Sequence, residues 1–82
     1  MRMFRVHNRA YNPRLVLAVD AEQAIHSCIQ TGHLKRPQMV RRIRDVTDTI
    51  DQELMADSLK ALLRQGQPGI LTFTNEGWSV RT

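Results

Sequence analysis

The most reactive side chains in this sequence are a single cysteine and three histidines, and their spacing decides which chemistry they support. His26 and Cys28 lie two positions apart in a segment with helical periodicity, so on a helix they point in different directions. A nucleophile needs a base and an orienting group within reach, and Cys28 falls on the apolar side of this segment. We therefore interpret Cys28 as a buried structural thiol.

The same residues do not have the spacing of a metal site. His7, His26, His33 and Cys28 are never three or four positions apart, and one cysteine allows no Cys pair. Acidic residues gather between positions 45 and 57, where capping and the dipole of a following helix account for them. Glycine-rich phosphate loops, nucleophile elbows and zincin motifs do not occur. We predict neither an enzyme nor a cofactor or metal.

The basic residues carry the strongest functional signal. Residues 1 to 44 hold nine Lys or Arg against two acids, a balance of +7, while residues 45 to 82 hold three against six, a balance of −3. Ten of the twelve cations are Arg, whose planar fork suits phosphate or carboxylate. The candidate binding residues are Arg9, Tyr11, Lys35, Arg36, Arg41, Arg42 and Arg44. Five of these seven belong to the stretch KRPQMVRRIRDVTD at positions 35 to 48.

The elements that position these residues begin with a hairpin. Residues 3 to 7 alternate apolar and polar side chains, and residues 15 to 19 form an apolar run, so two strands are predicted. The turn between them, NRAYNP, exposes Arg9 and Tyr11. Asp20 and Gln23 then form a capping box for a helix over residues 21 to 31, and Gly32 is a typical left-handed C-cap.

The basic stretch itself is compatible with two structures. As a strand over residues 41 to 47 it places Arg42 and Arg44 on one face and Arg41 on the other, with a poor apolar stripe. As a helix from Pro37, its apolar residues fall at near-helical spacing. Its β-branched residues favour the strand, which is our prediction, with the helix as the alternative.

The last third of the chain predicts a helix and a second hairpin. Leu54, Met55, Leu59, Leu62 and Leu63 form an apolar stripe in a helix over residues 51 to 65, which Gly66 ends. A hairpin over residues 69 to 80 follows, with Asn-Glu-Gly as a three-residue loop that holds its glycine in the left-handed region.

These elements predict one α+β domain over residues 1 to 82. The order β-β-α-β-α-β-β indicates a two-layer domain, an antiparallel or mixed sheet with both helices on one face. If the third strand lies beside the first hairpin, the arginines of that hairpin form one face with the basic residues 35 to 44. The predicted core consists of Phe4, Val6, Leu15, Leu17, Val19, Ile25, Ile29, Leu54, Leu59, Leu62, Leu63, Leu71 and Phe73.

Hydropathy and the single cysteine predict a cytoplasmic protein, and the basic residues without a catalytic constellation predict that it acts by binding. The longest apolar run, residues 15 to 19, is too short to span a bilayer, and a lone cysteine fits a reducing compartment. The leading hypothesis is a non-enzymatic accessory module, an adaptor or inhibitor of the phage or mobile-element type, that docks on a partner protein or nucleoprotein. Direct nucleic-acid binding by the same arginines is the alternative. A homodimer, in which a second copy offers its acidic 45–57 surface to the arginines, is also compatible with the charges.

Overall fold

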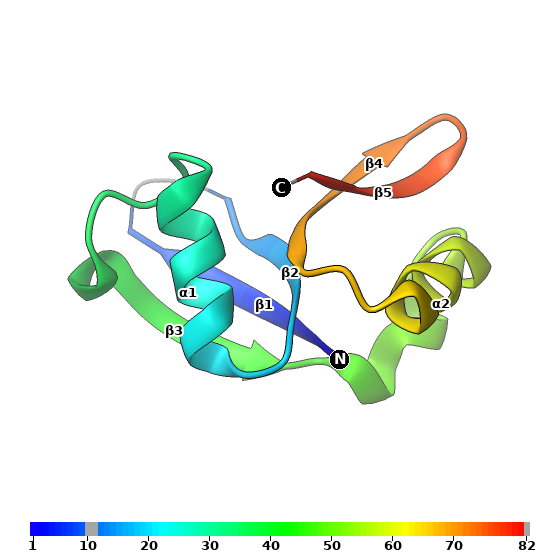
Figure 1. The fold of residues 1–82 in the computed structure, drawn as a ribbon, viewed down its shortest axis with the longest axis horizontal. Coiled ribbons are helices and arrows are strands. Elements are labelled where there is room, and N and C mark those ends of the chain that lie inside the picture. The colour runs from blue at the N-terminus through cyan, green and yellow to red at the C-terminus, as the bar shows by residue number, and fades with distance from the viewer. Residues whose placement is uncertain (10–11, 82) are drawn as a thin grey trace.

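The computed structural model describes residues 1–9 and 12–81, and within them the chain has the predicted order of elements (Figure 1). The main elements are the strands β1 (Arg2–Asn8), β2 (Arg14–Ala18), β3 (Val40–Asp45), β4 (Gly69–Thr74) and β5 (Gly77–Arg81) and the helices α1 (Ala21–Gln30) and α2 (Ala56–Gln65). Two 3-10 helices, η1 (Pro37–Met39) and η2 (Thr47–Gln52), flank β3. The predicted α+β class is confirmed.

One antiparallel sheet joins the five strands of the described residues, in the order β3-β1-β2-β4-β5. The predicted N-terminal hairpin pairs Met3 with Leu17 and Arg5 with Leu15. β3 pairs with β1 and forms one edge of the sheet, so the third strand lies beside the first hairpin. β5 forms the other edge, and in Figure 1 the β4–β5 hairpin extends above α2.

The prediction that both helices cover one face of the sheet is wrong. α1 packs on a cluster that includes Phe4 and Val16, whereas α2 packs on a cluster that includes Met3 and Leu17. Adjacent residues of a strand point to opposite faces, so the helices lie on opposite sides of β1 and β2. The physical reason is that these strands are apolar on both faces: Met3 and Phe4 are both buried, as are all four residues from 15 to 18.

Local signals fixed the limits of α1. Asp20 caps the helix by accepting a hydrogen bond from the Gln23 amide (2.8 Å), and the Gln23 side chain accepts one from the Val19 amide (2.7 Å). At the other end Gly32 has a φ of +82°, and the His33 amide donates to the Cys28 carbonyl (2.9 Å). The helix ends at Gln30, one residue before the predicted limit, with Thr31 as its C-cap.

The basic stretch forms a strand, as predicted, but over Val40–Asp45 rather than residues 41 to 47. Pro37 begins a short 3-10 helix before it, so the helical pattern seen in the sequence has a partial counterpart. The α-helix predicted from residue 51 begins instead at Ala56. Residues 47–52 are a 3-10 helix, and Met55, with a φ of +52°, separates that helix from α2.

The second hairpin is tighter than predicted. Thr74 pairs with Gly77, so the loop contains only Asn75 and Glu76. Gly77 has a φ of +114° and is the first residue of β5 rather than the last residue of a three-residue loop. A Cβ on Gly77 would lie 3.0 Å from the Ser58 hydroxyl, so the absence of a side chain lets the hairpin approach α2 closely.

The predicted core is confirmed for most of its residues and wrong for three of them. Six of its thirteen members are buried: Phe4, Val6, Leu15, Leu17, Leu59 and Leu71. Ile25, Ile29, Leu62 and Leu63 are partly buried against it. The remaining three, Val19, Leu54 and Phe73, are exposed because they lie at or beyond the ends of their elements. Among the described residues, no helix is long and apolar enough to cross a membrane.

Candidate docking surface

The structure gathers most of the predicted binding residues at one edge of the sheet. Arg41, Arg42 and Arg44 lie on β3 and are exposed, and Lys35 and Arg36 lie in the bend before η1, which precedes that strand. Asn8 pairs with Val40, which places the exposed Arg9 at the end of the sheet where β3 begins. The remaining candidate, Tyr11, lies outside the described residues.

An irregularity in β3 changes the grouping of these arginines. His7 pairs with Arg42, whereas Asn8 pairs with Val40, so Arg41 is an extra residue that opposes no partner of its own. A β-bulge of this kind reverses the alternation of side chains beyond it. Arg41 and Arg42 consequently line one hollow of about 260 Å³ together with His7 and Asn8. The expectation that Arg41 points away from Arg42 is wrong.

The bulge also explains the poor apolar stripe of the strand. With strict alternation Val40 and Ile43 fall on opposite faces, but the extra residue places both on the face covered by α1. Beyond the bulge, Arg44 pairs with Arg5 and Val46 packs in the cluster beneath α2. β3 is therefore a normal half-buried strand with one insertion, and the insertion concentrates positive charge at its start.

Ion pairs divide the cations of the first half of the chain into two groups. The Arg2 guanidinium donates to Asp45 (2.7 Å), and the Arg5 guanidinium donates to Glu53 (2.9 Å). Hydrogen bonds from Arg2 and then from Thr47 lower the pKa of Asp45 to about 2. In contrast, Arg41, Arg42 and Arg44 have no ion pair or side-chain hydrogen bond with any described residue.

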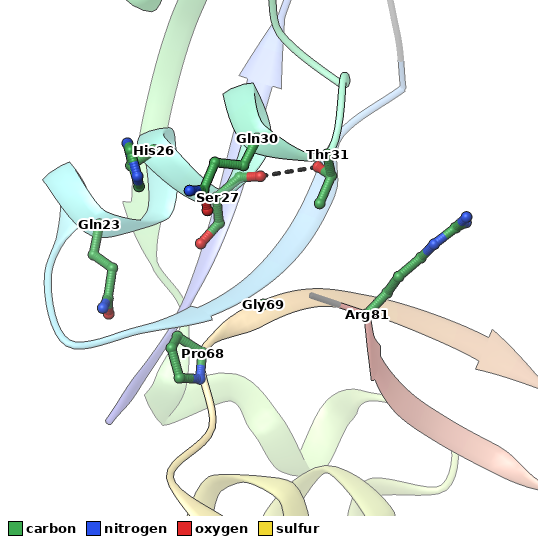
Figure 2. A pocket seen from close by; sticks show the side chains of 8 residues that line it. All are labelled: Gln23, His26, Ser27, Gln30, Thr31, Pro68, Gly69 and Arg81. Atoms are coloured by element: carbon green, nitrogen blue, oxygen red, sulfur yellow. Dashed lines mark hydrogen bonds between the residues drawn. The ribbon is translucent and has the colours of Figure 1, made fainter.

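A second hollow, of about 220 Å³, lies between α1 and the C-terminal hairpin (Figure 2). His26 and Ser27 both line it, but they are consecutive residues of α1. In Figure 2 Arg81 extends away from His26, and the interaction drawn joins the Thr31 hydroxyl to the Ser27 carbonyl (2.9 Å). No carboxylate lines the hollow, so its residues supply no acid–base pair or oriented nucleophile.

The remaining reactive groups do not converge either. Burial raises the pKa of the Cys28 thiol to about 11, which keeps it protonated at neutral pH. His33 has its pKa lowered by burial and then by the nearby positive charges of Arg14 and Arg81. Within residues 1–9 and 12–81, no three His, Cys, Asp or Glu side chains gather in a way that would hold a metal ion.

A third hollow, of about 500 Å³, lies on the sheet face opposite α1, and the sequence analysis did not anticipate it. Its wall includes Arg5, Leu15, Leu71, Phe73 and Trp78, from four strands. Phe73 was predicted in the core, yet its pair with Trp78 is the last but one before the turn, and Phe73 is exposed. The position of Phe73 so close before the turn residues is the signal that would have placed its ring near the turn end of the hairpin.

Comparisons with models of protein families, with curated protein sequences and with solved structures found no match for this chain.

Proposed function

We propose that this protein is a non-enzymatic accessory or regulatory module, an adaptor or inhibitor, that docks on a partner protein or nucleoprotein through Arg41, Arg42 and Arg44. The observation that supports this proposal is the contrast between paired and unpaired arginines. Arg2 and Arg5 are neutralised within the chain, whereas the three arginines of β3 are exposed and form no ion pair with a described residue.

Exposed guanidinium groups on a sheet make an effective docking surface because the strand fixes their backbone. Each presents several N–H donors in one plane and binds carboxylates through two parallel hydrogen bonds. The bulge places Arg41 beside Arg42, and Arg44 follows two residues later on the face that it shares with Arg5. Three such groups on one short strand attract an acidic partner and orient it.

Direct nucleic-acid binding is the second candidate, and one observation favours it. Arg41, Arg42, His7 and Asn8 enclose a polar hollow in which a phosphate group would meet several donors. Against it, acidic side chains lie directly beside the arginines: Asp45 ends the same strand, and Glu53 contacts Arg5. A backbone with a phosphate at every nucleotide would approach these carboxylates, so the protein partner is the better proposal.

A homodimer would require the acidic 45–57 surface of a second copy to bind the arginines of β3. Asp45, Asp51 and Glu53 are already paired within the chain, with Arg2, Lys60 and Arg5 respectively. Among the described residues only Asp48 and Asp57 of this surface form no ion pair, so a second copy offers the arginines of β3 two acids unless the existing pairs are replaced. We therefore propose a different protein, rather than a second copy, as the partner.

The test is a pull-down from the native host with immobilised protein, before and after nuclease treatment. We expect a specific protein to remain after nuclease and to be lost with Arg42→Glu combined with Arg44→Glu. Because of the bulge, Arg41→Glu should also weaken the interaction. Arg64→Glu, at an exposed position on α2, is the matched control and should retain the partner.

Direct nucleic-acid binding by the same arginines predicts a different result. If the arginines contact phosphates, affinity for a 20-nucleotide single strand should fall linearly with salt on a log–log plot, by roughly 0.7 per contact. Removing one arginine should then reduce the slope by about that amount. Complete release of the bound material by nuclease, together with this salt dependence, would refute docking on a protein.

A further inference from the structure

The sheet face opposite α1 is covered along only part of its length. Near the start of β1, Met3 and Leu17 are buried in a cluster with Ile50 of η2 and Leu59 of α2. Further along, Arg5 faces Arg44 on one side and Leu15 on the other, and the hollow of about 500 Å³ opens over this row. We call this uncovered region, with the adjoining loop residues 54 and 55, the open half of the sheet.

Large apolar side chains are exposed at the β4–β5 side of the open half. Phe73 is 47% exposed, Leu54 is 73% exposed and Met55 is 49% exposed. Phe73 and Trp78 pack edge to face with ring centroids 5.0 Å apart. The Trp78 indole donates to the Leu54 carbonyl (2.8 Å), which ties the hairpin to the loop before α2. Exposed apolar residues held near one another in this way are typical of an interaction surface.

Charge differs between the two sides of this apolar patch. On the β1–β3 side, Arg44 lies beside Arg5, and Arg42 lies beside His7, all on the same face because directly paired residues share a face. On the other side Glu76 occupies the hairpin turn, and Asp57 lies in the first turn of α2. The arginine side favours carboxylates, while the acidic side disfavours a nucleic-acid strand laid across the patch.

The free edge of β3 is a less suitable site for the same partner. An extended peptide adds to a sheet by pairing with unpaired backbone groups along an edge strand. Natural proteins protect edges against such pairing with charged side chains and bulges, and β3 has three arginines and the bulge at Arg41 within six residues. Contact through side chains on the open half is therefore favoured over strand addition at the edge.

We propose that the open half of the sheet binds an acidic protein segment that carries a large apolar side chain. The apolar side chain enters the hollow against Leu71, Phe73 and Trp78, and neighbouring carboxylates bind Arg42 and Arg44. This inference rests on the proposed function, because the arginines are shared. It adds a second requirement, an apolar anchor, which acidic residues alone do not meet.

The experiment selects peptides from a displayed library of random 12-residue sequences on the immobilised protein. We expect enriched peptides to combine Asp or Glu with Phe, Trp, Leu or Met, and to shift the Trp78 indole signal in a ¹H–¹⁵N spectrum. Their affinity should fall at least tenfold with Phe73→Ala, and also with Arg42→Glu combined with Arg44→Glu. Leu54→Ala tests the same patch at a position with no core role.

Val19→Ala is the matched control, because Val19 is an exposed apolar residue that follows the C-terminal end of β2, whereas Leu15, near the start of β2, lines the hollow. It should leave the affinity within twofold, and denaturant unfolding should show that every variant folds. Three results would overturn the inference: no enrichment, enriched peptides that lack acids or large apolar residues, or full binding by Phe73→Ala. Competition by a 20-nucleotide oligo(dT) that depends on Phe73 would instead assign the patch to nucleic acid.

The two proposals fail in different ways. If binding depends on the arginines but not on Phe73, the proposed docking surface stands and the apolar anchor is refuted. If binding depends on Phe73 but is unaffected by Arg42→Glu combined with Arg44→Glu, the arginine-based function is refuted.

Discussion

Replacement of Leu59 by alanine tests the arrangement of the second helix most directly. Leu59 is 0% exposed and packs in the cluster of Met3, Leu17 and Leu71 beneath α2. Truncation of a fully buried leucine costs roughly 2 to 5 kcal/mol, because the transfer energy of the lost atoms adds to that of the cavity. A chain of 82 residues has a free energy of unfolding of roughly 4 to 12 kcal/mol. One substitution therefore removes a large share of it.

Urea unfolding followed by fluorescence of the single tryptophan measures this cost. Trp78 packs on Phe73 and is hydrogen-bonded to Leu54, so its environment changes on unfolding. With a urea dependence of about 1 kcal/mol per M, Leu59→Ala should lower the midpoint by about 2 M or more.

Leu54→Ala is the matched control, because the sequence periodicity predicts that Leu54 and Leu59 lie on the same apolar stripe of one helix. Leu54 lies before α2 and is largely exposed, so its truncation should change the free energy of unfolding by no more than about 0.5 kcal/mol. Leu62→Ala, at a partly buried position, should fall between the two. If Leu54→Ala and Leu59→Ala lowered the free energy of unfolding equally, α2 would not begin at Ala56, and the helix predicted from residue 51 would be supported instead.

Two further predictions concern titratable groups. Asp45→Asn should destabilise the protein at pH 7 by no more than about 1 kcal/mol, because both partners of the Arg2–Asp45 pair are exposed. Since the folded-state pKa of Asp45 is lowered to about 2, from an unfolded value of about 3.9, this contribution is present above pH 4 and lost as the pH falls towards 2. Urea midpoints of both proteins should therefore converge near pH 2, and an unchanged gap there would contradict the assignment. At pH 8, Cys28 should react with a thiol reagent at least about a hundredfold more slowly in the folded protein than in urea, because the side chain is buried and burial raises its pKa to about 11; similar rates would show that the thiol is accessible.

Short-range patterns in the sequence predicted the parts of the fold that depend on neighbouring residues. The capping box of Asp20 and Gln23 and the left-handed Gly32 set the limits of α1 because each acts through the backbone of adjacent residues. The run LVLAV and the turn residues Asn-Glu-Gly likewise predicted β2 and the second hairpin, although the loop is one residue shorter than predicted. Hydrophobic alternation and turn residues are local properties, so one sequence suffices to recognise them.

Tertiary structure decided which faces these elements present, because that depends on pairing between distant segments. Met3 and Phe4 are both buried since helices cover both faces of β1, and no local pattern states where α2 packs. Only the pairing of β3 with β1 creates the bulge that groups Arg41 with Arg42. Likewise, Arg5 is neutralised by Glu53, 48 positions away, while Arg44 beside it remains unpaired. The sequence by itself determined that the chain is rich in arginine; the register of an edge strand and a few long-range ion pairs determined which arginines face solvent with free donors.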